Sequence, residues 1–193
     1  MAVVKIEYPY TERTIRALKA GDAVEITGPV ITGRDKLHKF FADGGEVPAE
    51  FRGGCLYHCG PVVVKERGEW RVKAAGPTTS VRENPYEPAF IAKTGVRIII
   101  GKGGMDASTL AAMKRHGCVY VQAVGGAAAL AAASLQRVVK VDHLEDFGAA
   151  EACWHFAASG FRGIVAMDAH GVSLFDSVRA DSAKELARLL GKS

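Results

Sequence analysis

A tight turn near the middle of the chain is followed by two hydroxyl side chains and an arginine, in the segment Ala75-Gly-Pro-Thr-Thr-Ser-Val-Arg82. Thr78 and Thr79 supply adjacent hydroxyls, and Arg82 lies one helical turn beyond Thr78. A guanidinium with hydroxyls beside it can donate several hydrogen bonds to a carboxylate, and the charged donor makes the strongest of them. The segment therefore predicts a receptor for a substrate that carries a carboxylate.

Two further cations lie in similar glycine-containing turns. Lys102 stands in Gly101-Lys-Gly-Gly104, and Arg34 follows a glycine directly after a predicted strand. Turns after the strands of an α/β sheet line the ligand crevice, and glycine lets backbone amides approach an anion closely. Any one of these cations alone is better explained as a solvated surface charge. Arg34, Arg82 and Lys102 together favour a site for a small molecule with two carboxylates, with Thr79 as a further substrate contact.

Two residues are candidates for proton transfer. Thr78 can move a proton only beside positive charge or a relay partner, because its alkoxide is strongly disfavoured at neutral pH. The alternative is that Thr78 and Thr79 merely cap the next segment. His38 lies three residues after Asp35 on a predicted helix, a spacing at which a carboxylate can orient an imidazole. A structural role for His38 fits the pattern equally well, and the other five histidines are treated as structural or surface residues.

The elements that must hold these residues alternate between strand and helix in the middle of the chain. Apolar runs predict buried strands at 96–100, 119–124, 138–141 and 164–167, and helices are expected at 85–94, 106–116, 126–135 and 182–190. Before them, the pattern predicts a helix at 11–18, strands at 23–27 and 30–32, a helix at 33–41, and a hairpin of strands 55–64 and 70–75. This order favours an α/β architecture in one domain that covers residues 1–193.

Composition sets the class of protein. Apolar residues form 48% of the 193-residue chain, which is enough for a core, and the net charge of +4 suits small anionic substrates. We expect no nucleic-acid partner, because basic residues form no block. No apolar run approaches the roughly 20 residues of a membrane span, and the N-terminus lacks a signal-peptide pattern. A cytoplasmic protein without a membrane partner is therefore expected.

The cysteine spacing argues against a metal site in this chain. Cys55 and Cys59 are four residues apart, but they lie in a predicted strand, where such residues stand far apart along one face. Buried, reduced cysteines are the preferred interpretation, and we expect no metal ligands here.

Five segments together resemble the β subunit, or C-terminal domain, of the iron–sulfur class I fumarase and L(+)-tartrate dehydratase family. They are Ile31-Thr-Gly-Arg-Asp-Lys-Leu-His38, Tyr57-His-Cys-Gly-Pro61, Gly76-Pro-Thr-Thr-Ser-Val-Arg82, Gly95-Val-Arg-Ile-Ile-Ile-Gly-Lys-Gly-Gly-Met105 and Val165-Ala-Met-Asp-Ala-His-Gly171. They span most of the chain and keep the family's order, so the set is far more specific than any one turn.

The resemblance implies reversible hydration of fumarate to L-malate, in a swivelling β/β/α fold. It implies that a partner α subunit, in an α2β2 assembly, holds a [4Fe–4S] cluster through three cysteines, so this chain needs no metal ligands. Thr78 resembles the family's proposed base, and His38 an active-site histidine of the tartrate dehydratase branch. Arg34, Arg82 and Lys102 resemble the residues that bind the substrate carboxylates.

One departure and two alternatives accompany the resemblance. Many members carry Met after the motif arginine, whereas Glu83-Asn84-Pro85 follows here, which bears on local helix geometry and substrate preference. The first alternative is the same chemistry on L(+)-tartrate, which the motifs do not separate from fumarate. The second is a non-catalytic binding or assembly module, because a fold can be kept without its function.

Overall fold

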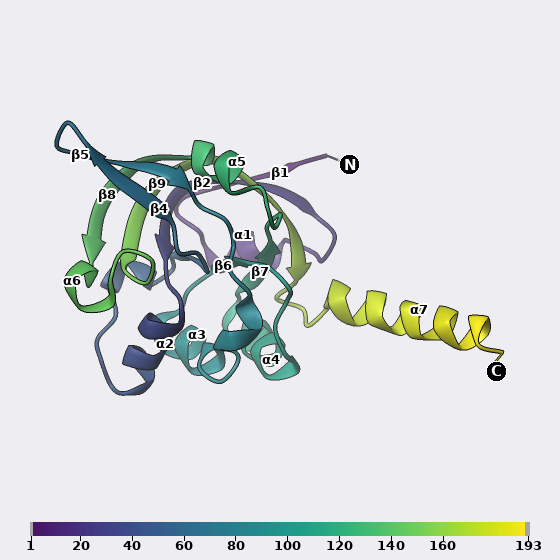
Figure 1. Ribbon diagram of the computed structural model, residues 1–193. Coiled ribbons are helices and arrows are strands. Elements are labelled where there is room, and N and C mark those ends of the chain that lie inside the picture. Colours follow the sequence, from purple (N-terminus) through teal and green to yellow (C-terminus); the bar gives the residue numbers. More distant parts are fainter. Residues whose placement is uncertain (1, 192–193) are drawn as a thin grey trace.

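The computed structural model describes residues 2–191 and is a mixed α/β protein whose main sheet has seven strands (Figure 1). In spatial order the strands are β1 (Val4–Glu7), β2 (Ala23–Thr32), β3 (Cys55–Tyr57), β6 (Ile98–Gly101), β7 (Val119–Gln122), β9 (Cys153–Met167) and β8 (Leu135–Asp142). The strands from β1 to β7 are parallel to their neighbours, and β9 runs antiparallel to β7 and β8. The fold is thus α/β with a mixed sheet, as the sequence indicated.

Strand β9 also pairs antiparallel with β2, from Ala23↔Ile164 to Ile31↔His155. This pairing connects the two ends of the run β2-β3-β6-β7-β9, so these strands form a closed ring. One apolar core lies inside, and a second lies between the parallel strands and the helices. Along β6, Ile98 and Ile100 join the first core and Ile99 the second, as the two-residue period of a strand requires.

Three helices lie together on one side of the parallel strands in Figure 1: α2 (Asp35–Ala42), α3 (Glu87–Thr94) and α4 (Ala107–His116). The predicted caps of α4 are confirmed, since Asp106 Oδ1 accepts a hydrogen bond from Thr109 N at 2.9 Å and Gly117 ends the helix with φ +68°. The remaining helices are α1 (Glu12–Arg16), α5 (Ala128–Ser134), α6 (Leu144–Phe147), α7 (Leu174–Leu189) and the 3₁₀ turns η1 (Ala49–Phe51) and η2 (Ser80–Glu83).

Several predicted boundaries were wrong. The predicted strand 55–64 divides into β3, in the main sheet, and β4 (Val62–Glu66), which forms the expected hairpin with β5 (Glu69–Ala74). Helix α3 begins at Glu87 rather than residue 85, because the 3₁₀ turn η2 precedes it. The strand predicted at 164–167 is only the end of the 15-residue β9, whose polar residues and glycines hide the strand pattern.

The tail helix α7 is longer than the predicted 182–190. Ser173 caps it by accepting a hydrogen bond from Asp176 N at 3.3 Å, and the helix extends away from the rest of the molecule (Figure 1). Within residues 2–191 no helix combines the length and the apolar character that crossing a membrane requires.

The parallel strands explain how the candidate residues come together. Arg34 follows the end of β2, His58 the end of β3 and Lys102 the end of β6. Because these strands are parallel neighbours, their carboxyl ends meet at one edge of the sheet, where ligands of α/β proteins bind. The hairpin β4–β5 returns the chain to the same edge, where the 75–82 turn follows it.

Candidate functional site

A single carboxylate lies between two of the candidate arginines. Oδ2 of Asp35 is 3.0 Å from Arg82 Nη2 and 3.8 Å from Arg34 Nη2. The side chains of Asp35 and Arg82 are each 45% exposed, so solvent reaches this pair. The helix spacing predicted that Asp35 orients His38, whereas in the structure Asp35 joins the two arginines. The structure thus presents two guanidinium groups that already bind one carboxylate.

Thr78 lies in direct contact with this group. Arg82 Nη2 donates a hydrogen bond to Thr78 Oγ1 at 3.0 Å, and Thr78 N donates to the His58 carbonyl at 2.7 Å. The backbone bond fixes the turn, and the guanidinium supplies the positive charge that a threonine alkoxide would need. Thr79 stands at the N-cap position of η2, but its hydroxyl makes no capping hydrogen bond. The alternative that Thr79 merely caps this segment is therefore not supported.

Lys102 reaches the same edge through backbone pairing. Its carbonyl accepts a hydrogen bond from Ser80 N at 3.0 Å, and its backbone pairs in parallel with that of Thr79. No carboxylate among residues 2–191 lies within ion-pair distance of Lys102 Nζ. Lys102 is therefore a half-buried cation beside the hydroxyl turn, available to an anionic ligand.

Arg34 is held from a second side. Its guanidinium lies 3.2 Å from Glu151 Oε1 and donates to the Ala150 carbonyl at 3.4 Å. Gly60 packs closely against it, because a Cβ at Gly60 would collide with Arg34 Nη1 and with the Ala150 oxygen. The Cys59-Gly60-Pro61 turn therefore leaves room for the arginine, a purpose that the sequence alone did not reveal.

His38 lies beneath this surface and is fully buried. Its Nδ1 atom is 2.9 Å from the Arg34 carbonyl and 3.3 Å from Glu83 Oε2, and its Nε2 atom is 3.1 Å from Glu87 Oε2. The carboxylates beside it are thus Glu83 and Glu87 rather than Asp35. In this structure His38 contacts the backbone of Arg34 and has no exposed surface for a substrate.

His58 extends the buried cluster. Its Nε2 atom is 3.2 Å from the same Glu87 oxygen, and its Nδ1 atom is 2.9 Å from Ser80 Oγ. Ser80 Oγ in turn lies 2.9 Å from Tyr120 OH. The sequence predicts a structural or surface role for His58, and Glu87 and Ser80 were not among the predicted site residues. The four-residue spacing of Glu83 and Glu87 is the one sequence feature that could have indicated this buried cluster.

Burial and opposite charges shift the pKa values of this cluster in opposite directions. Burial alone would lower the pKa of His38, but Glu87 and Glu83 outweigh it and raise that pKa to about 9. Burial would raise the pKa of Glu87, but His38 and His58 hold it below its usual range. For Glu83, burial dominates and raises the pKa to about 7. Burial lowers the pKa of His58.

Two of the residues that depart from the family pattern, Glu83 and Asn84, make specific contacts in the structure. Glu83 is fully buried beside His38, and Asn84 Oδ1 accepts a hydrogen bond from Asp106 N at 3.2 Å. These residues therefore pack the end of η2 against His38 and join it to the start of α4.

The four cysteines do not form a metal centre. Cys55, Cys59, Cys118 and Cys153 are all free and buried, and burial raises the pKa of each thiol. Within residues 2–191 no cysteine belongs to a group of three or more ligand atoms that lie close together. The expected burial of the cysteines is confirmed, and among the described residues they do not lie together as the thiolate ligands of an iron–sulfur cluster would.

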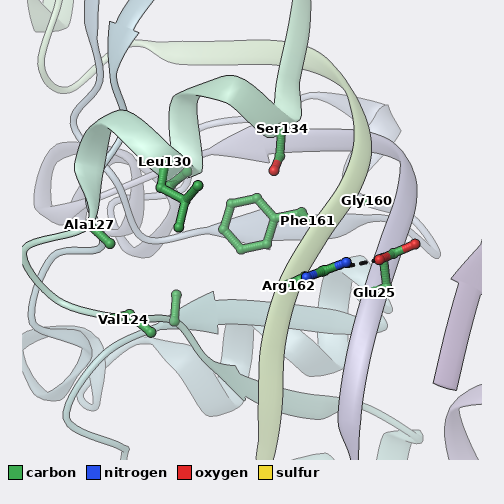
Figure 2. A pocket seen from close by; sticks show the side chains of 10 residues that line it. Glu25, Val124, Ala127, Leu130, Ser134, Gly160, Phe161 and Arg162 are labelled. Atoms are coloured by element: carbon green, nitrogen blue, oxygen red, sulfur yellow. Dashed lines mark hydrogen bonds and ion pairs between the residues drawn. The ribbon is translucent and has the colours of Figure 1, made fainter. Parts of the chain in front are cut away.

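A separate cavity of about 420 Å³ lies between α5 and strands β2 and β9. Figure 2 shows Val124, Leu130 and Phe161 around it, with one ion pair of 3.2 Å between Arg162 and Glu25 at its rim. Its lining is mainly apolar, and its single cation is already paired. The cavity does not suit a dicarboxylate, unlike the surface that carries Arg34, Thr78, Arg82 and Lys102.

Comparison with known proteins gives consistent matches. Residues 1–178 match the family model described as Fumarase C-terminus. The chain is 47% identical over 187 residues to a protein of Geobacillus stearothermophilus named as a class I fumarate hydratase, covering 96% of this chain and 36% of that protein. The chain therefore spans about a third of the length of this relative.

Two further relatives are nearer to this chain in length. One is a Methanocaldococcus jannaschii protein named as L(+)-tartrate dehydratase subunit beta, 36% identical over 194 residues that cover 96% of this chain and 100% of the relative. The other is the L(+)-tartrate dehydratase subunit beta of Escherichia coli, 32% identical over 86% of this chain and 83% of the relative. All three names refer to hydro-lyases.

Proposed function

Because the chain belongs to the Fumarase C-terminus family, we propose that it is the β subunit of a class I hydro-lyase that interconverts fumarate and L-malate. The observation that carries the proposal is the carboxylate-binding arrangement of Arg34 and Arg82, with Arg82 bonded to the Thr78 hydroxyl. The 47% identity to a protein named as a class I fumarate hydratase favours fumarate as the substrate.

In this proposal one substrate carboxylate takes the place of Asp35 between the two arginines. Arg34 and Arg82 can bind it in a bidentate way, and Lys102 binds the second carboxylate as a point charge, with the Thr79 hydroxyl beside it. The two carboxylates of fumarate lie at opposite ends of its double bond. Anchoring both ends therefore fixes the reacting carbons beside Thr78.

Thr78 carries the proton in this proposal. During hydration its hydroxyl gives a proton to one carbon of the double bond, while hydroxide from water bonds to the other carbon. The proton left by that water returns to the Thr78 alkoxide, so atoms and charge balance. Arg82, 3.0 Å from Thr78 Oγ1, stabilises the alkoxide between the two steps. Dehydration runs through the same groups in reverse.

We propose that a partner α subunit completes the site, in an α2β2 assembly, and that swivelling of this β/β/α domain opens and closes it. The relatives named subunit beta support the need for a partner. The partner would hold the [4Fe–4S] cluster, which supplies a Lewis acid for the substrate hydroxyl and carboxylate. This chain's buried thiols do not fit that group, so its own contribution is to bind, orient and protonate.

His38 has a positioning role in this proposal. It is fully buried, so it acts on the substrate only through the Arg34 backbone that its Nδ1 atom contacts. A replacement of His38 is expected to displace the Arg34 turn rather than remove a group that contacts substrate.

Reconstitution tests the function. This chain alone is expected to show no hydratase activity, and activity should appear when the α subunit is added under anaerobic conditions. Arg82→Lys is expected to lower kcat/KM by about 100-fold, because the bidentate contact and the bond to Thr78 are both lost. The matched control is Arg71→Lys, on the exposed strand β5, which should leave kcat/KM unchanged.

The same preparation separates the alternatives. L(+)-tartrate is the second candidate substrate, because two relatives are named for its dehydration. Parallel assays with fumarate, L-malate and L(+)-tartrate give the ratio of kcat/KM values that decides between them. Full activity after replacement of Thr78, Arg82 and Lys102 together would instead favour a non-catalytic assembly module.

A further inference from the structure

The fully buried cluster below the candidate site contains most of the buried side-chain polar atoms that lack a hydrogen bond among residues 2–191. Eight buried side-chain nitrogen and oxygen atoms among residues 2–191 have no hydrogen-bond partner, and six of them belong to His38, His58, Glu83 and Glu87. An unpaired buried polar atom costs free energy, and a buried carboxylate costs more. Six such atoms in one place indicate that a further species satisfies them.

The geometry of three of these residues suits a cation. Nε2 of His38 and Nε2 of His58 lie 3.1 and 3.2 Å from the same oxygen of Glu87, and the three ligand atoms are within 4.8 Å of one another. Neither ring nitrogen makes a hydrogen bond to that oxygen, although both distances would allow one. Ligand atoms around a tetrahedral zinc ion, at bonds of 2.0–2.1 Å, stand about 3.3 Å apart.

The outer nitrogens of both rings are placed as metal-binding histidines require. His38 Nδ1 is 2.9 Å from the Arg34 carbonyl, which can only accept a hydrogen bond, so Nδ1 carries the proton. His58 Nδ1 is 2.9 Å from Ser80 Oγ. With a proton on Nδ1, the lone pair of Nε2 faces the cluster, as in a histidine that binds a metal through Nε2.

The charge of the cluster also calls for a cation. Glu83 and Glu87 are two buried carboxyl groups in one small region, and His38 lies between them. One divalent cation neutralises both carboxylates.

We propose that His38, His58 and Glu87 bind one divalent cation, with zinc as the best-suited ion. Imidazole and carboxylate ligands suit zinc, and the three side chains supply three of the four ligands of a tetrahedral site. The ion would join α2, the turn after β3 and helix α3. It would thereby fix the Arg34 turn through His38 and the Thr78 turn through His58, whose carbonyl binds Thr78 N. The ion takes no direct part in the proposed reaction, and its binding does not require that the proposed function is correct.

Metal analysis of the purified full chain, prepared alone and without chelators, tests this site. We expect one zinc ion per chain by elemental mass spectrometry. After removal of the metal with a chelator, zinc at 100 times its Kd should raise the melting temperature by about 5–10 °C. Four-coordinate Co²⁺ in the same site should give the intense visible absorption that six-coordinate Co²⁺ lacks.

Two variants locate the site. Glu87→Gln keeps the shape of the side chain but removes the ligand charge, so it should lose the zinc-dependent rise in melting temperature. His155→Gln is the matched control, because His155 is also buried and paired with a carboxylate, Asp142 at 2.7 Å, but lies outside the cluster. This control should respond to zinc as the unchanged protein does.

Two results would overturn the proposal. One is a wild-type chain that retains no zinc after incubation and shows no change in melting temperature. The other is a folded Glu87→Gln variant that binds zinc as tightly as wild type. The wild-type measurement decides the question even if Glu87→Gln does not fold. None of these measurements depends on hydratase activity, so they test the zinc site separately from the proposed function.

Discussion

Arg82 and Asp35 form a partly exposed ion pair of 3.0 Å in the candidate site, and Arg34 faces the same carboxylate oxygen. In the proposed function a substrate carboxylate takes the position that Asp35 occupies between these arginines. Asp35→Asn removes this internal competitor, and we expect KM for the dicarboxylate to fall about two- to fivefold, in keeping with an exposed ion pair worth under 1 kcal/mol. Steady-state kinetics measures it, and a higher KM would show that Asp35 instead orients the arginines for binding.

Gly60 leaves the space that the Arg34 side chain needs. We expect Gly60→Ala to displace Arg34 and lower kcat/KM at least tenfold, because the added Cβ meets both Arg34 Nη1 and the Ala150 oxygen. Gly125→Ala is the control, since its Cβ would lie 3.6 Å from Lys102 Cδ, an ordinary contact. Equal kcat/KM values for Gly60→Ala and wild type would contradict this placement of Arg34.

That the candidate residues lie at one edge of the sheet could be predicted from the sequence, but the contacts among them could not. Arg34, Lys102 and the Thr78 turn come together because they follow parallel strands or pair with one that does, and short apolar strands ended by glycine are visible in sequence. The predicted carboxylate partner of His38 was wrong. Spacing within a helix favoured Asp35, whereas packing of α3 against α2 brings Glu87 from far along the chain. Such contacts depend on tertiary packing, which a local pattern does not contain.

The thiols offer a check on the core. All four cysteines are buried with raised pKa values, so we expect no rapid reaction of the native chain with a thiol reagent at neutral pH. All four should react after unfolding in denaturant. A fast-reacting thiol in the native chain would contradict the burial of that cysteine.

The lowered pKa of Asp168 predicts how the free energy of unfolding depends on pH. Burial would raise its pKa, but the backbone N–H groups of Ala20, His170 and Val172 donate to its carboxylate at 2.9–3.0 Å and lower it. Because the folded pKa lies below the unfolded one, this stabilisation is present above the unfolded pKa and is lost as pH falls through the folded value.

Asp168→Asn is accordingly expected to lower the free energy of unfolding at pH 7 by about 1–3 kcal/mol. The difference from wild type should shrink in acid, below the ordinary pKa of an aspartate. Denaturant unfolding at several pH values measures both trends. A difference that stays constant down to pH 2 would mean that the ionised carboxylate contributes nothing.

The most direct test of the proposed chemistry is the turnover of the active complex carrying Thr78→Val, compared with Thr78→Ser. Valine keeps the shape of threonine without the hydroxyl, whereas serine keeps the hydroxyl 3.0 Å from Arg82. We expect kcat for fumarate hydration to fall about 100- to 10,000-fold with valine, the range of general acid–base catalysis, and to recover largely with serine. A valine variant that keeps the wild-type kcat would contradict proton transfer by Thr78.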